Sequence, residues 1–304
     1  MLKTNRDKLL IQEVVGIVSH PSMLVDGGLI GAYVTTWDGK PKIGLGIGGI
    51  KYNVKVGDSC FGWAEAEYLE PGVALKSLEE GAQSPGGGRG GDRSLHQYSC
   101  VGNEVTVISG GGKGVRGLVT GKTGYAGLPY HTLAYFSEED IHKIKIGDKV
   151  SVIAEGIGLK IEGFDGEVFN MSPKFLDSLN LTLEKGVLRM PVVKEIPAYV
   201  MGHGVGGDPA GLGHWSIQTS PPVLVKENGL ETLRIGDLVA CKDILMQYGK
   251  TYYKDAITVG IIAFGASDIA GHGPGVFAIA ESKTGKLQPI IDPDANVAKY
   301  LGVK

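Results

Sequence analysis

The chain has 304 residues, 42% of them hydrophobic, and a formal net charge of −3 from 30 basic and 33 acidic side chains. This length supplies core material for one large domain or two, and the charge balance provides no positive field for binding nucleic acid. The three cysteines form no CxxC pair, so they indicate neither a disulfide framework nor a thiolate zinc site. No apolar run reaches the roughly 20 residues of a membrane span, and the first residues do not resemble a signal peptide. We therefore expect a cytoplasmic protein without membrane or nucleic-acid partners.

Glycine is the outlier of the composition, with 49 residues in 304, about twice the usual share of roughly 7%. The glycines separate short β-branched runs, a pattern typical of strands joined by tight turns. In chain order these runs include residues 105–108, 149–153 and 256–262. The sequence therefore predicts a mainly β protein, a β-rich α+β fold with barrel- or sandwich-like units in which strand exceeds helix.

An apolar residue followed by Gly-Asp precedes three strand-like runs, at residues 56–58, 146–148 and 235–237. Glycine supplies a positive φ, and aspartate caps the turn from which the strand begins. The three glycines are almost evenly spaced along the chain (147 − 57 = 90 and 236 − 147 = 89). This spacing is compatible with three related β units and equally with three ordinary turns.

Helices are expected to be few and short. Ser137 stands at a start that resembles a capping box, and Ser172 and Pro173 open a second stretch with apolar residues on one face. A third helix is expected over residues 296–301.

The domain organisation allows two interpretations. A boundary near residue 133 divides the chain into an N-terminal β-rich domain, residues 1–132, and a C-terminal β-rich barrel-like domain, residues 133–304. A single continuous domain is the alternative.

The glycine-rich segment 109–123 contains Gly121-Lys122-Thr123 but lacks the spacing of a P-loop. That motif needs a glycine five residues before Gly121, where this chain has Arg116. A looser anion-binding nest remains a hypothesis, with a plain β hairpin as the alternative. The candidate anion-binding residues are Lys113, Arg116 and Lys122.

Two histidines, His203 and His272, are each flanked by glycines, and each lies within five residues of an aspartate, Asp208 or Asp268. A ligand, a metal ion or a second backbone can approach such an imidazole closely, because little surrounds it. Imidazole with carboxylate is a competent ligand set for Zn, Mn or Fe and a competent general acid/base pair. If the loops gather at one rim of a barrel, we expect the two histidines to meet there. Hydrogen-bonded turn residues are the simpler alternative, since no spacing-specific motif such as HExxH is present.

Several other polar residues receive a structural interpretation. The acidic residues near position 67 could form an acidic wall, although alternation along a strand explains them equally well. We interpret three further histidines as structural or surface residues. These residues are Glu65, Glu67 and Glu70, and His96, His131 and His142.

Six strings of the chain lie at residues 48–58, 70–73, 102–104, 109–122, 197–202 and 270–276, and the last is the most specific. Together they resemble a bacterial and archaeal family of unknown function that is known mainly from structural genomics. The resemblance covers nearly the whole chain and implies a cytoplasmic, β-rich protein without an assigned activity. A weaker likeness, carried by the Gly-Asp turns and by Asp165-Gly-Glu167, links the chain to acetamidase/formamidase-type metal-dependent hydrolases as an analogy of fold.

The sequence favours an enzyme of small-molecule metabolism, a metal-assisted hydrolase or lyase with a divalent metal ion at a His/Asp loop site. The rival interpretation is a non-catalytic protein that binds a small molecule or an anion, or an oligomeric scaffold built from copies of this chain. Preorganised, buried histidines would favour the enzyme, and histidines bonded to their own turns would favour the rival. The candidate catalytic residues are His203, His272, Asp268 and Asp208, and the candidate metal ligands are His203, His272 and His214.

Overall fold

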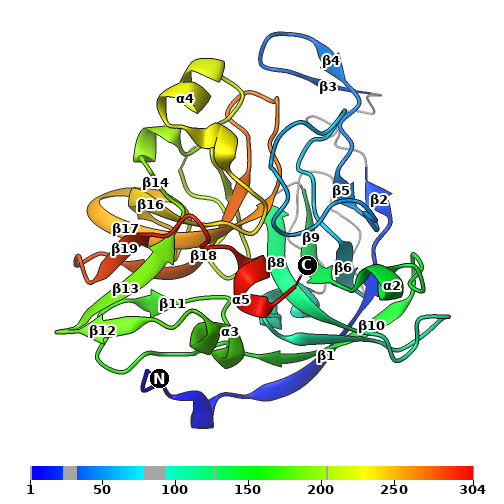
Figure 1. The fold of residues 1–304 in the computed structure, drawn as a ribbon, viewed down its shortest axis with the longest axis horizontal. Coiled ribbons are helices and arrows are strands. Elements are labelled where there is room, and N and C mark those ends of the chain that lie inside the picture. Colours follow the sequence, from blue (N-terminus) through cyan, green and yellow to red (C-terminus); the bar gives the residue numbers. More distant parts are fainter. Residues whose placement is uncertain (1, 23–32, 79–92, 126–127, 203–204, 304) are drawn as a thin grey trace.

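The computed structural model describes residues 2–22, 33–78, 93–125, 128–202 and 205–303. Strands account for 42% of the structure and helices for 13%, so the expected mainly β fold is confirmed. Figure 1 shows a barrel on the right and a second sheet on the left. No helix in the described ranges is long and apolar enough to cross a bilayer.

The barrel consists of antiparallel strands closed in the order β1-β10-β7-β8-β9-β6. Its interior is filled by alternate β-branched and leucine side chains, including Val18, Leu75 and Val119, none of which is exposed. The strands are β1 (Ile11–Val18), β6 (Val73–Ser77), β7 (Glu104–Val107), β8 (Arg116–Tyr125), β9 (Leu128–Tyr135) and β10 (Lys149–Glu155).

The second sheet has the order β11-β18-β17-β16-β14, with β15 paired to β18. A smaller sheet, in the order β12-β13-β19, and two short antiparallel pairs, β2-β5 and β3-β4, complete the strands of the described residues. The second sheet contains β11 (Glu167–Val168), β14 (Lys194–Ile196), β15 (Trp215–Ser216), β16 (Leu238–Leu245), β17 (Thr251–Phe264) and β18 (Gly275–Ser282). The others are β2 (Pro21–Ser22), β3 (Val34–Thr35), β4 (Pro41–Lys42), β5 (Ile47–Gly48), β12 (Thr182–Glu184), β13 (Val187–Val192) and β19 (Leu287–Ile291).

The helices are short, and all three that the sequence predicts are present. Their caps act as expected: Ser137 Oγ accepts from Asp140 N at 3.2 Å, and Ser172 Oγ accepts from Phe175 N at 3.1 Å. The α-helices are α1 (Ser94–Tyr98), α2 (Glu138–Ile141), α3 (Pro173–Ser178), α4 (Pro222–Glu227) and α5 (Val297–Leu301). The 3-10 helices are η1 (Arg6–Lys8), η3 (Ala198–Val200) and η4 (Leu230–Thr232).

The three Gly-Asp sequences form the same turn. In each, the aspartate Oδ2 accepts from the backbone N–H three residues earlier, at 2.7, 2.8 and 2.8 Å. The glycines have φ of +102°, +85° and +90°, a conformation that side chains with a Cβ rarely adopt. Each turn also exchanges two backbone hydrogen bonds with one residue of another segment. In chain order of the turns, these residues are Ile235, Val18 and Ile262. The local signal therefore predicts both the turn and its cap, as the structure has them.

The barrel and the second sheet share one apolar core. Leu133 of the barrel belongs to the same buried cluster as Ile261 of β17 and Phe277 of β18. At Gly121 in β8 a Cβ would lie 3.5 Å from Phe277, so this strand packs directly on the sheet. The boundary expected near residue 133 stays a prediction, although β9 runs through this position and β10 closes the same barrel from beyond it.

The close contact at Gly260, in the middle of β17, gives a test of this packing. A Cβ at Gly260 would overlap Val276 Cγ1 and lie 2.6 Å from the carbonyl oxygen of Phe277. We expect Gly260→Ala to lower the free energy of unfolding by about 1–3 kcal/mol, as overpacking does. Gly111→Ala is the control, because its Cβ would meet only Lys143 O, at 3.8 Å. Equal urea midpoints for the two variants would contradict the close approach.

Candidate functional site

An enclosed carboxylate, that of Glu70, joins three elements of the structure. Its side chain is 3% exposed. Oε2 accepts from the backbone N–H of Gly48 in β5 at 2.7 Å, and Oε1 accepts from Thr123 Oγ1 in β8 at 2.6 Å. His131 Nδ1, in β9, lies 3.1 and 2.9 Å from the two oxygens. Because the carboxylate can only accept, His131 carries a proton on Nδ1 and donates it.

The surroundings of Glu70 keep it charged. Burial raises its pKa, but the imidazole of His131, the ammonium of Lys51 and the hydroxyl of Thr123 act in the opposite direction and more strongly together. The pKa of Glu70 is therefore lowered from 4.5 to about 2. A negative charge consequently stands inside the molecule at neutral pH, paired with an imidazole.

Tyr68, two residues before Glu70, brings two histidines together. Its hydroxyl is hydrogen-bonded to His272 Nδ1. Its ring centroid lies 5.5 Å from that of His272, 6.3 Å from that of His214 and 5.0 Å from that of Phe264. Tyr68 has a φ of +50°, which is rare for a bulky residue and is maintained here by burial on these rings. Two of the three predicted metal ligands thus lie against one buried tyrosine.

His214 is 1% exposed, and one of its ring nitrogens is engaged in a hydrogen bond with the backbone. Its Nδ1 accepts from the backbone N–H of Gly124 at 2.9 Å, so the neutral ring carries its proton on Nε2. Gly124 follows Thr123, the residue that donates to Glu70. Strand β8 therefore connects the Glu70 cluster with the histidines around Tyr68.

The two predicted aspartates lie in different surroundings. Asp208 is 2% exposed and accepts a hydrogen bond of 2.5 Å from the hydroxyl of Tyr130, whose ring carries the guanidinium of Arg93 at 4.0 Å. Asp268, with 54% of its side chain exposed, instead forms an ion pair of 2.7 Å with Lys42. The partner of Asp268 is therefore the ammonium of Lys42, and the partner of Asp208 is the phenol of Tyr130.

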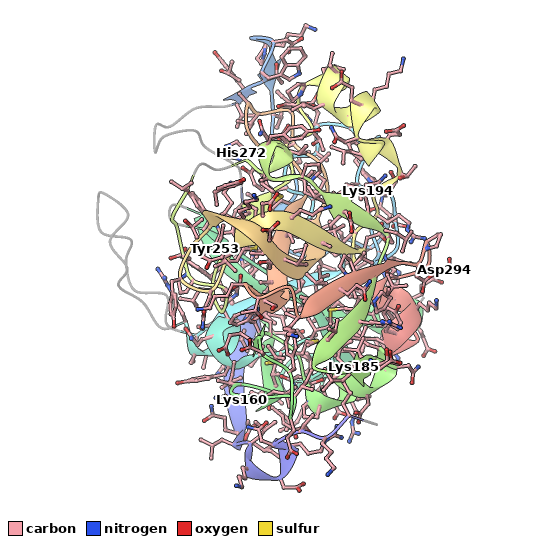
Figure 2. The ribbon with its side chains drawn as sticks, turned by 90° about the vertical axis from the view of Figure 1, so that its left-hand side faces the viewer. Lys160, Lys185, Lys194, Tyr253, His272 and Asp294 are labelled. Carbon is pink, nitrogen blue, oxygen red and sulfur yellow. The ribbon has the colours of Figure 1, made fainter. Side chains whose placement is uncertain are left out.

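His203 lies outside the described residues, but the backbones beside both glycine-flanked histidines are in contact. A Cβ at Gly202 would clash with the carbonyl oxygen of Gly271. The ammonium of Lys250 donates to the carbonyl oxygens of Met201, at 3.1 Å, and of Gly202. The two loops thus lie side by side where they lead into His203 and His272, and convergence of the two imidazoles stays a prediction. Figure 2 shows His272 toward one end of the molecule, far from Lys160.

The predicted anion-binding residues do not form one group. Lys122 is 2% exposed, and its Nζ donates to Asn170 Oδ1 at 2.9 Å and to the carbonyl oxygen of Gly211 at 3.0 Å. Arg116 and Lys113 are exposed, and Arg116 lies near Glu104. Arg116 and Lys122 stand at opposite ends of a stretch of β8 that is about 20 Å long. Burial lowers the pKa of Lys122 to about 8.

Sequence reasoning missed the residues at the centre of this site. The sequence assigns Glu70 to an acidic wall or to alternation along a strand, and His131 to a structural or surface role. The available signal is that Tyr68 and Glu70 stand two residues apart. The Gly-rich segment 44–49, which supplies the N–H of Gly48 to Glu70, lies about 20 residues earlier in the chain. Among the residues that the structure describes, no three His, Cys, Asp or Glu side chains are grouped so as to hold a metal ion.

Comparison with known proteins gives a family but no activity. Residues 33–177 match the model of the N-terminal part of DUF4438, a domain of unknown function, and residues 178–301 match its C-terminal part. The crystal structure of TM1086 is similar, with a TM-score of 0.86 and 36% identity over 98% of this chain and 99% of that chain. No curated protein matches the chain. The resemblance to a family of unknown function is therefore confirmed.

The lowered pKa of Glu70 predicts a specific loss of stability in acid. Because the folded-state pKa, about 2, lies below the ordinary 4.5, the stabilisation is complete above about pH 4.5 and is lost as the pH falls through 2. In urea unfolding, Glu70→Gln should be less stable than the wild type at neutral pH by about 3 kcal/mol. This difference should shrink below about pH 4.5.

Glu139→Gln is the control for this experiment, since 85% of the Glu139 side chain is exposed. It should follow the wild type across the whole pH range. A difference between wild type and Glu70→Gln that stays constant down to about pH 2 would contradict a carboxylate held charged by its neighbours.

Proposed function

We propose that this chain, which belongs to the DUF4438 family, is an enzyme of small-molecule metabolism, a hydrolase or lyase that works by general acid–base chemistry. The observation that carries the proposal is the hydrogen bond between the Tyr68 hydroxyl and His272 Nδ1. A phenol bonded to an imidazole can pass a proton in either direction, and imidazole titrates near neutral pH. His272 is the partly exposed member of this pair, and Tyr68 the buried one.

In this mechanism His272 exchanges a proton with the substrate, and Tyr68 supplies or receives the proton on the other side of the ring. The strained backbone of Tyr68 supports a functional role, because such conformations gather at active sites. Glu70 acts as a positioning residue. Its charge holds the segment that carries Tyr68 against strands β8 and β9 through Thr123 and His131.

His214 and Asp208 belong to the same proposal, His214 as a neighbour of Tyr68 and Asp208 as a buried carboxylate six residues before His214 in the chain. His214 packs on the ring of Tyr68, and Asp208 accepts from Tyr130, the residue before His131. The metal-assisted form of the proposal adds a divalent ion and His203 to His272. Element analysis of protein purified without a nickel column measures whether such an ion accompanies the chain.

The hydrogen-bonded pair of Tyr68 and His272 gives a direct test of the proposed function. Wild-type protein is assayed against a panel of small amides, esters and hydroxy acids for hydrolysis or elimination. For any substrate turned over, Tyr68→Phe and His272→Gln should each lower kcat by about 100-fold or more, the usual contribution of general acid–base catalysis. KM should change less, because the proton transfer belongs to the transition state.

Tyr199→Phe is the matched control, since Tyr199 is 64% exposed and its hydroxyl donates to Asn228 Oδ1 at 3.0 Å. It should retain the activity of the wild type. Full kcat in Tyr68→Phe, with an unchanged pH profile, would remove Tyr68 from the mechanism. Binding of panel compounds without turnover would favour the rival function, a non-catalytic ligand-binding protein.

A further inference from the structure

A pocket lies beside the barrel, next to the segment that carries Glu70. Its volume is about 360 Å³, a figure that includes the open solvent at its mouth. Pro71 and Gly72, the residues after Glu70, form part of its wall, whereas Glu70 faces Gly48 and His131. The apolar side chains that line the pocket are Val54, Val56, Ala134, Phe136 and Ile141.

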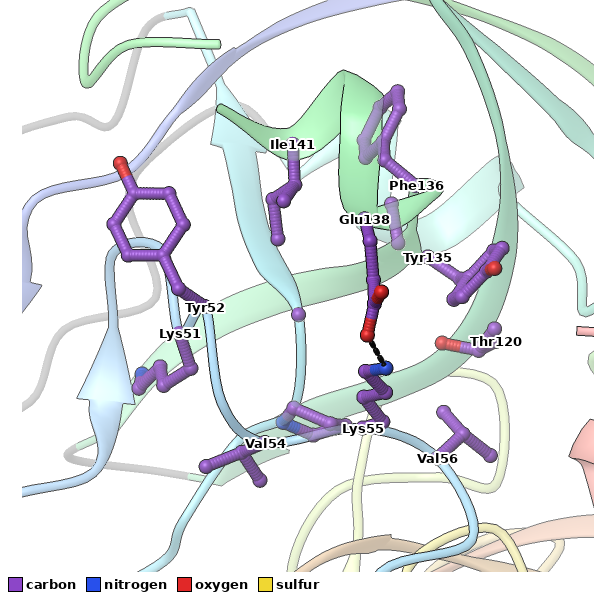
Figure 3. A pocket seen from close by; sticks show the side chains of 13 residues that line it. Lys51, Tyr52, Val54, Lys55, Val56, Thr120, Tyr135, Phe136, Glu138 and Ile141 are labelled. Carbon is purple, nitrogen blue, oxygen red and sulfur yellow. Dashed lines mark hydrogen bonds and ion pairs between the residues drawn. The ribbon is translucent and has the colours of Figure 1, made fainter. Parts of the chain in front are cut away.

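The polar side of the pocket carries an ion pair between Lys55 and Glu138. Figure 3 shows Glu138 extending from helix α2 to the ammonium of Lys55. The side chains are 35% and 78% exposed, and ion pairs near the surface contribute little to stability. Another anion can therefore take the place of the Glu138 carboxylate on Lys55 at small cost.

The cation of the pocket that can meet an anion is Lys55. Lys51 also lines the pocket, but its ammonium interacts with the buried carboxylate of Glu70, and the carboxylate in the lining itself is that of Glu138. The ammonium of Lys51 donates to the carbonyl oxygen of Gly48, and burial lowers its pKa. A lysine ammonium beside apolar walls suits a ligand that has an apolar body and a negative end.

Lys55 is also held in place before any ligand arrives. It is the first residue of a Gly-Asp turn, in which its N–H donates to Asp58 Oδ2 at 2.7 Å and its carbonyl oxygen accepts from Asp58 N at 3.1 Å. A fixed backbone reduces the ordering that a ligand must impose on its partner. We propose that this pocket binds a small organic acid, whose apolar body packs on the valine and phenylalanine side chains and whose carboxylate replaces Glu138 on Lys55.

Isothermal titration calorimetry with hexanoate and phenylacetate tests the proposal. Hexanamide is the neutral comparison, and it should bind at least about tenfold more weakly than hexanoate. Lys55→Met should raise the Kd of hexanoate by about tenfold, and Glu138→Ala should lower it, because the competing carboxylate is gone. Glu139→Ala, on the same helix but outside the pocket lining, should leave the Kd unchanged.

Three results would overturn the proposal: hexanoate and hexanamide that bind equally, no binding of either acid, or a wild-type Kd in Lys55→Met. Circular dichroism and amide NMR spectra of each variant establish that it is folded, and shifts confined to residues 51–56 and 134–141 would locate the ligand. The site is independent of the proposed function. Tyr68→Phe should therefore bind hexanoate like the wild type, whatever it does to turnover.

Discussion

The enclosed charge of Glu70 is the interaction on which the centre of this molecule depends. A carboxylate at 3% exposure is stable only if donors replace the water it has lost. The donors come from β5, β8 and β9, which are separated in the chain but meet at the two carboxylate oxygens. They also fix the position of Tyr68, two residues earlier, against His272. Removing the charge would therefore disturb the hydrogen-bonded pair of Tyr68 and His272 as well as the barrel.

Buried positive charges stabilise the neighbouring loop in a different way. Lys122 and Lys250 donate mainly to backbone carbonyl oxygens, and burial lowers the pKa of each to about 8. Lys250 bonds the carbonyl oxygens of residues 201 and 202, and Lys122 bonds that of residue 211. Asp208 lies between these two anchored points in the chain. Each ammonium comes from outside the stretch 201–211: Lys122 belongs to β8, and Lys250 is paired with Gly206 by a β-bridge.

Structural features that depend on a few neighbouring residues could be predicted from the sequence, whereas contacts between distant residues could not. The Gly-Asp turns and the serine caps follow from local chemistry, and the structure has them. The inward direction of Lys122 depends on a β-bulge between Val119 and Gly121. A bulge shifts the side-chain alternation by one residue, so Lys122 faces the interior although Arg116, six residues earlier, is exposed. The pairing of Glu70 with His131 spans 61 residues and has no local signature.

The glycine excess has a second cause besides turns, and this bears on the role of His272. Gly202 contacts the backbone of Gly271, and Gly273 lies so close to the carbonyl oxygen of Ile217 that no Cβ would fit. The His272 carbonyl oxygen also accepts from Thr219 N at 3.1 Å. These contacts are made by backbone atoms, so the path of the loop is set by its glycines and not by the imidazole. The loop does not need the imidazole of His272 for its shape, and this imidazole is hydrogen-bonded to the strained, buried Tyr68. Under the proposed function, His272 therefore serves in proton transfer.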